Sequence, residues 1–240
     1  MLPSAHIVRC PVSHYSLHLD RSQDFFDEGN YSAAKAAAEK ALTYAQPEEG
    51  SDARRIIALS LRKLEFNDEA LDMLCRLVET EPSPEICAEY ALMCAERGNC
   101  DENCRNFAQR AIEEDPDLPS AYIAMFWCDA ESGEYLEALQ NLKKGMLRGA
   151  DFSDSRAFEL IRGWCQDLCN QNESDLAFKL TTAVVDLFNN TDFLVLHARI
   201  AEINNEHRVA VSYYKRALSH LRQGSSLRIE ILEAIANIAI

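Results

Sequence analysis

The chain has 240 residues, and its 48% hydrophobic and 26% charged residues are ordinary values for a folded protein. Eight glycines and seven prolines are too few for a collagenous or disordered chain, and the length excludes a stapled mini-protein. Thirty-nine Asp and Glu residues against 24 Lys and Arg residues give a formal net charge of −15, which disfavours direct, non-specific binding to nucleic acid.

The cysteines and the N-terminal residues indicate the compartment. Nine cysteines are an odd number, which argues against a disulfide framework and for a reducing environment. Residues 1–10 lack the charged leader and apolar core of a secretory signal, and no stretch approaches the roughly eighteen apolar residues of a membrane span. We therefore expect an intracellular protein, cytoplasmic or nuclear, with no membrane span.

Small residues recur at a fixed place after polar turns. These anchor residues lie 33 to 39 residues apart, at Ala34, Ala70, Cys104, Ala138, Ala177 and Ala210. The residues four and seven positions after each anchor share one helical face, and most of them are small or apolar. The sequence therefore predicts a repeat of about 34 residues, with a helix at each anchor.

A second amphipathic pattern precedes each anchor, for example Ile57-Ala58 followed by Leu61. Each repeat is thus expected to be a pair of helices, and Pro82 and Pro116 are placed to stop the second helix of their pairs. One pair cannot bury its apolar face alone, so neighbouring pairs should stack.

This order of small, aromatic and apolar positions resembles the tetratricopeptide repeat (TPR), most clearly in 133–139 and 210–218. The resemblance implies an all-α fold, a right-handed α-solenoid of about six TPR-like helix pairs plus a C-terminal helix. The array would cover 15–225, after an N-terminal extension at 1–14 and before a helix at 226–240 that caps it or starts a further repeat. The units are expected near 15–48, 51–82, 85–117, 119–150, 154–190 and 191–222.

Some positions depart from the TPR pattern. Asp129 stands where a large ring is expected, and Phe126 where a small residue is expected. The third unit holds one extra residue between Gly98 and Cys104, and the longest step predicts a longer loop around 149–153. The first and fifth units fit the pattern least well.

Two narrower resemblances bear on function. TPR modules that clamp the Glu-Glu-Val-Asp tail of heat-shock chaperones carry a Lys and Asn pair in the first helix, where this chain has Leu19 and Gln23. Chaperone-tail binding is therefore not expected. Residues 147–188 resemble, more weakly, the TPR-type meiotic scaffold proteins that promote crossover formation and synapsis. This second resemblance implies a meiotic recombination scaffold as an alternative.

Side chains with potential chemistry form no recognisable catalytic motif. Cys100 and Cys104, like Cys165 and Cys169, are four residues apart, but a structural zinc site needs four ligands, and Cys104 and Cys165 occupy small core positions. The six histidines are scattered, and no nucleotide-binding or nucleophile motif occurs. We expect no catalysis, no metal and no cofactor; a thiol metal or redox protein is the alternative and predicts stoichiometric zinc.

The concave surface of such a solenoid is lined by the first helices of the pairs, and residues beside their packed stripe point into it. Tyr90, Met93 and Trp127 form a patch typical of interaction hot spots, unless Trp127 is core, and two arginines supply guanidiniums that pair with carboxylates. The predicted partner-binding residues are Ile56, Leu59, Tyr90, Met93, Ile123, Trp127, Arg162 and Arg199.

These patterns predict a non-catalytic scaffold or adaptor that binds a peptide or helix of a partner protein in its concave groove. Its acidic surface favours a basic partner. The alternative is an interaction or targeting segment of a larger enzyme or multi-subunit assembly, cut at Ile240. The sequence leaves the identity of the partner and the oligomeric state open.

Overall fold

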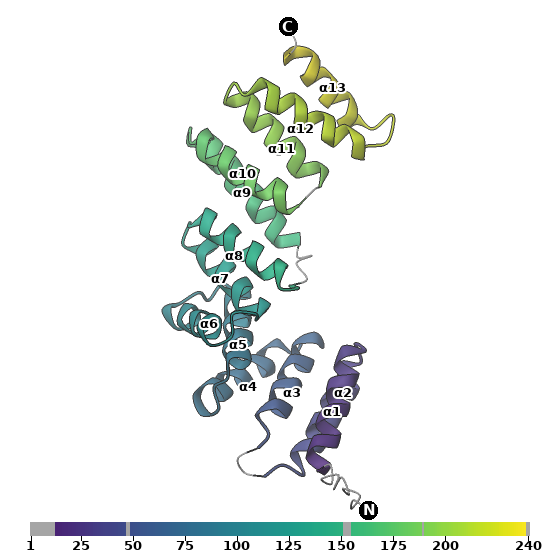
Figure 1. Cartoon of the computed structure of the whole chain (residues 1–240), viewed down its shortest axis with the longest axis vertical. Helices are drawn as coiled ribbons and strands as arrows, with labels where there is room; N and C mark the ends of the chain where they lie inside the picture. Colours follow the sequence, from purple (N-terminus) through teal and green to yellow (C-terminus); the bar gives the residue numbers. More distant parts are fainter. Residues whose placement is uncertain (1–12, 47–48, 151–154, 189, 239–240) are drawn as a thin grey trace, which may run out of the picture. The chain divides into compact units, whose positions relative to one another are not determined.

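The computed structural model describes residues 13–46, 49–150, 155–188 and 190–238. Over these residues the chain forms thirteen helices and no strand (Figure 1). The helices are α1 (His14–Asp27), α2 (Tyr31–Leu42), α3 (Ser51–Lys63), α4 (Asn67–Thr80), α5 (Pro84–Glu96), α6 (Glu102–Glu114), α7 (Pro119–Glu131), α8 (Tyr135–Leu147), α9 (Ser155–Asn170), α10 (Ser174–Leu187), α11 (Thr191–Ile203), α12 (His207–His220) and α13 (Ser226–Ile238).

The helices form six pairs, α1–α2 to α11–α12, followed by α13. The two helices of a pair pack on each other in α1–α2, α3–α4, α5–α6, α9–α10 and α11–α12, and a second helix packs on the first helix of the following pair in α2–α3, α4–α5 and α10–α11. This confirms the predicted all-α, solenoid-type architecture of helix pairs. None of the described helices is both long and apolar enough to cross a lipid bilayer.

The chain divides into two compact units, Met1–Cys128 and Asp129–Ile240, and the boundary falls inside α7. Unit 1 holds the first three helix pairs, and unit 2 holds α8 to α13. Residues 1–12 of the predicted N-terminal extension, most of the predicted long loop and Ile240 lie outside the described residues, and His14 already belongs to α1.

Small anchor residues explain why the helices of a pair approach closely. Ala34, Ala70, Ala138 and Ala210 are completely buried. A methyl group at these positions lets the second helix settle against its neighbours, and the larger apolar residues on the same face then fill the space between helices. Cys104 takes the same place in α6, where its Sγ atom lies 3.2 Å from the Ala91 carbonyl oxygen.

A left-handed residue ends the first helix of every pair. Five residues before the anchor, or six in the third pair, φ is positive: Gly29, Glu65, Gly98, Gly133, Asn172 and Asn205. Gly and Asn adopt this conformation readily, whereas for Glu65, at φ 69°, the conformation is unfavourable because of the steric clash of its Cβ atom. The six-residue spacing in the third pair confirms its predicted extra residue.

Phe126 and Asp129, the two residues of α7 that depart from the TPR pattern, are both buried. Phe126 is fully buried, and its ring packs edge-on against that of Trp127. Asp129 is 2% exposed, and its carboxylate accepts a 2.7 Å hydrogen bond from the Asn141 side chain in α8. A charged residue at this core position is tolerated because it is hydrogen-bonded.

Candidate functional site

Unit 1 presents two different faces, which we name by the helices that form them. The first-helix face is formed by α1, α3 and α5, and α1 packs directly on α3. The second-helix face is formed by α2, α4 and α6. On this face α2 and α4 both pack on α3, which lies between them. In this part of unit 1 the first helices α1 and α3 therefore lie closer together than the second helices α2 and α4 do.

Three of the predicted binding residues are not available to a partner. Ile56 and Met93 are 3% exposed and belong to the hydrophobic core of unit 1, and Ile123 is 7% exposed. The prediction that they line an open surface was therefore wrong. A first helix such as α3 packs on α1, α2 and α4, so its buried stripe is wider than a two-helix contact requires.

The predicted aromatic patch is only partly open. Tyr90 is half-buried, and its ring packs edge-on against Phe107 of its own pair with the centroids 5.5 Å apart. Trp127 is half-buried against Phe126 at 5.0 Å, and Leu59 is half-buried on α3. These side chains contribute to packing and leave only part of their surface for a partner.

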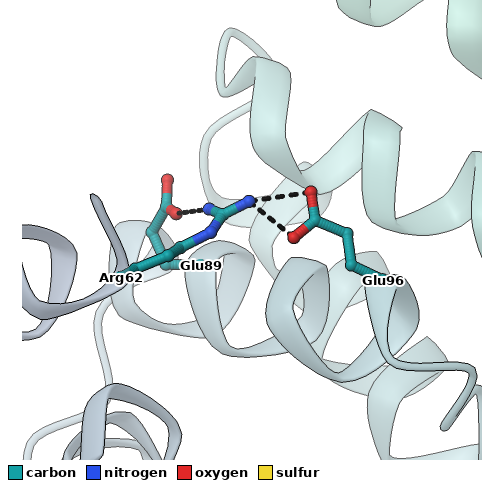
Figure 2. A network of polar contacts seen from close by, with 3 residues as sticks. All are labelled: Arg62, Glu89 and Glu96. Carbon is teal, nitrogen blue, oxygen red and sulfur yellow. Dashed lines mark hydrogen bonds and ion pairs between the residues drawn. The ribbon is translucent and has the colours of Figure 1, made fainter. Parts of the chain in front are cut away.

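A charged network crosses the first-helix face of unit 1 (Figure 2). Arg62 of α3 donates from Nη1 to Glu89 Oε2 at 3.3 Å and from Nη2 to both carboxylate oxygens of Glu96 at 2.7 Å. Both glutamates belong to α5, and the three side chains are 19–26% exposed. One guanidinium thus joins two first helices that are about 30 residues apart in the sequence.

Glu89 has an unusual environment within this network. Its burial raises its pKa, while the Arg62 guanidinium and a hydrogen bond from the Ser120 side chain lower it and only partly offset the cost of burial. This network therefore holds two carboxyl groups for one guanidinium.

The two predicted arginines of unit 2 already face carboxylates of this chain. Arg162 pairs with Glu159 one turn earlier on α9, and Arg199 of α11 lies 3.5 Å from Glu230 of α13. The side chains of both pairs are about half exposed or more. Exposed ion pairs of this kind contribute roughly 0.2–1 kcal/mol to stability, so a carboxylate of a partner can replace Glu159 or Glu230 as the partner of the arginine with little loss of free energy.

The second-helix face of unit 1 carries a hollow that the sequence did not predict. Two adjoining cavities of about 560 and 300 Å³ share Leu61 and Glu69, and together they form what we call the α2–α4 hollow. It is lined by Ser32, Lys35, Ala36, Glu39, Arg54, Leu61, Leu64, Phe66, Glu69, Asp72, Met73, Arg76, Leu77, Thr80 and Glu81.

An apolar floor and a charged rim define the α2–α4 hollow. Leu61, Met73 and Leu77 form the floor, and Phe66 stands beside it with 53% of its surface exposed. The one signal in the sequence is Phe66 itself, an aromatic residue in an otherwise polar turn. The hollow lies where α2 and α4 are separated by α3, and no local sequence pattern encodes that separation.

The rim charges of the hollow are mostly paired with one another. Ion pairs join Lys35 to Glu39 at 2.7 Å, Arg54 to Glu81 at 2.8 Å and Arg76 to Asp72 at 2.6 Å. Glu69 lies where the two cavities meet, and it adds one negative charge beyond these three pairs.

Unit 2 has a smaller counterpart of this hollow. A cavity of about 230 Å³ lies between α8 and α10, lined by residues that include Leu136, Leu139 and Leu187. The second helices α8 and α10 contact each other directly, so less space is left between them.

No metal centre is formed by the described residues, because no three His, Cys, Asp or Glu side chains there are grouped to hold an ion. The thiols at core positions behave as small apolar groups. Cys104 and Cys165 are buried, and burial raises the pKa of Cys165 to about 12.

The architecture matches solved structures of tetratricopeptide repeat proteins. PilF of Pseudomonas aeruginosa superposes with a TM-score of 0.60 at 16% sequence identity, covering 92% of this chain and 97% of that chain. The C-terminal part of a TPR repeat-containing protein from Cytophaga hutchinsonii gives 0.60 at 17% identity, covering 92% of this chain and 87% of that chain. The chain therefore has the TPR fold.

A further match is a chain of the APC/C hetero-tetramer Cut9–Hcn1, with a TM-score of 0.52 at 12% identity. That match covers 95% of this chain and 43% of the other. No protein-family model and no curated protein sequence matches the chain. At these identities the likeness concerns the fold alone.

Proposed function

We propose that this protein is a non-catalytic scaffold that binds a peptide or helix of a partner protein. The observation that supports this most directly is the α2–α4 hollow in unit 1. Its larger cavity, about 560 Å³, is in the range of pockets that hold a specific ligand. The TPR fold supports the proposal, since one protein of this fold is a component of a hetero-tetramer with a second protein.

The lining of the hollow indicates what the partner segment carries. The apolar floor of Leu61, Met73 and Leu77 fits a row of apolar side chains, as one face of an amphipathic helix provides. The surplus charge of Glu69 favours a basic residue beside that row, which agrees with the net charge of −15. This replaces the concave groove as the main proposed site, while Leu59, Trp127, Arg162 and Arg199 stay secondary candidates.

The experiment is an affinity capture on the immobilised full chain with quantitative mass spectrometry. Ala36→Arg places a bulky cation on the exposed rim of the hollow, so a partner seated there should be lost from the captured set. Gln109→Arg is the matched control, because Gln109 is an exposed residue of α6 that does not line the hollow. It should retain the partner.

Leu59→Ser separates the two faces of unit 1. If captured proteins survive Ala36→Arg and are lost with Leu59→Ser, binding occurs on the first-helix face and the assignment to the hollow is wrong. If the three variants and the wild type capture the same background, the scaffold proposal itself fails. The meiotic and larger-assembly alternatives stay predictions that these observations do not test.

A further inference from the structure

The charge of this chain is unevenly distributed around α12. Between Glu206 and Glu230 there is no Asp or Glu, although acidic residues number 39 in the 240-residue chain. Five basic residues fall in the same interval, and four of them have exposed side chains: Arg208, Lys215, Arg216 and Arg222. A local positive surface thus occurs in a chain of net charge −15.

The helix places part of this charge in a row. Arg208, Ser212, Lys215 and Ser219 follow one another at steps of four, three and four residues, which puts them on one face of α12. The buried residues Ala210, Tyr214 and Ala217 mark the packed side of the helix. With Arg222 two residues beyond the helix end, Arg208, Lys215 and Arg222 recur every seven residues, and we call these three residues with the serines between them the α12 ridge.

Among the described residues, the basic side chains of the ridge lack the carboxylate partner that several other basic residues of the chain have. Lys35, Arg54, Arg62, Arg76, Arg97 and Arg110 each have a carboxylate partner within this chain. Arg208, Lys215 and Arg222 form no ion pair with any described residue. Beside the ridge, the Arg216 guanidinium lies over the Tyr213 ring at 4.8 Å from its centroid.

We propose that the α12 ridge is a second docking surface that binds an acidic segment of a partner protein, with carboxylates repeating about every seven residues. Arg208 and Ser219 are eleven residues apart, or about 17 Å along the helix, which is roughly one and a half heptads of a partner helix. Carboxylates across the ridge would form the ion pairs that this chain does not supply. The α12 ridge lies in unit 2 and would bind an acidic segment, whereas the α2–α4 hollow lies in unit 1 and favours a basic residue.

A short acidic peptide fits this surface better than a long polyanion does. The remaining chain is strongly acidic, and the Debye length at physiological salt is about 8 Å. A short segment stays within the screened neighbourhood of the ridge, whereas nucleic acid or an anionic membrane extends over the acidic surroundings and is repelled.

The test measures binding of a fluorescent, helical, glutamate-rich peptide to the full chain by anisotropy at low and at physiological salt. The comparison probes are the same peptide with Gln for Glu, a single-stranded oligonucleotide and vesicles that contain phosphatidylserine. We expect the glutamate peptide to bind and the glutamine peptide to fail. Arg208→Glu with Lys215→Glu should weaken binding about tenfold or more, and Arg208→Ala with Lys215→Ala should weaken it by a smaller factor.

Lys143→Glu with Lys179→Glu is the matched control, since both lysines are exposed residues of unit 2 and the change in net charge is identical. The control should keep its affinity within about twofold. The proposal is overturned if the control loses affinity equally, if the oligonucleotide or the vesicles bind more tightly than the peptide, if the peptide does not bind at low salt, or if the reversal instead abolishes self-association of the chain.

Discussion

His197 is a buried titratable residue of α11 that contacts side chains of α10. Its side chain is 1% exposed, and its Nδ1 atom lies 2.8 Å from the Thr181 hydroxyl, which donates its proton to the Ala177 carbonyl. The hydrogen bond between His197 and Thr181 links the side chains of α11 and α10. The ring is also stacked on Phe178. Burial lowers the pKa of His197 to about 4, with a further lowering by Arg216 and an opposing effect of Asp186.

This depressed pKa predicts an acid-sensitive fold. Unfolded, His197 titrates near 6.5, so between that pH and about 4 the unfolded state binds a proton that the folded state does not. Above pH 6.5 the folded and unfolded states both hold His197 mostly neutral, so the free energy of unfolding has its full value there. Below pH 6.5 the free energy of unfolding decreases as the pH falls. From pH 7 to 5 we expect about 2 kcal/mol of loss from this residue in the unfolding free energy of unit 2. Urea titrations at several pH values measure it.

The control for this prediction is His220→Asn, because His220 is exposed at the end of α12. It should leave the pH dependence unchanged. His197→Asn should flatten it between pH 7 and 5, and an unchanged slope in that variant would show that other groups cause the acid sensitivity.

Glu65 makes a second residue-scale prediction, since it adopts a left-handed conformation where other repeats have Gly or Asn. Removing its Cβ atom removes a steric cost of roughly 1–2 kcal/mol, which the extra entropy of an unfolded glycine partly cancels. Glu65→Gly should therefore stabilise unit 1 by about 0.5–1 kcal/mol in chemical denaturation. Ala36→Gly, in the exposed middle of α2, should instead destabilise it by about 1 kcal/mol. Equal signs for the two variants would refute this explanation.

At the scale of elements, the Arg62 network is what joins α3 to α5 across the first-helix face. Removing the guanidinium leaves Glu89 and Glu96 partly buried and without their shared cation. Arg62→Ala should destabilise unit 1 by roughly 1–3 kcal/mol, less than the loss of a fully buried pair. Equilibrium denaturation measures the effect.

Two further variants test the cause of that loss. Arg76→Ala removes an exposed ion pair within α4 and should cost less than about 0.5 kcal/mol. Adding Glu89→Gln to Arg62→Ala should recover part of the stability, because it removes one stranded carboxylate. A double variant less stable than Arg62→Ala would show that lost packing by the arginine, and not stranded charge, is responsible.

At the scale of the whole molecule, each helix pair depends mainly on its immediate neighbours. Leu142 is fully buried in α8 of unit 2, and Leu142→Ala should destabilise that unit by roughly 2–5 kcal/mol. Hydrogen exchange with mass spectrometry should show faster exchange in α8 and α10 and nearly unchanged exchange in α1 to α4. Uniform acceleration over all described helices would instead mean that the chain unfolds as one cooperative body.

The helix pairs, their spacing and the extra residue of the third pair could all be predicted from the amino-acid sequence. These features are local, because anchor alanines, polar turns and left-handed Gly or Asn positions act within one repeat. Only the tertiary structure decided which side chains are open. Ile56, Met93 and Ile123 are buried, in the case of Ile56 because α3 packs on α1, α2 and α4. Arg62 pairs with carboxylates that are 27 and 34 residues away in the sequence. The α2–α4 hollow likewise comes from the spacing between second helices, which depends on how pairs stack and on no single stretch of sequence.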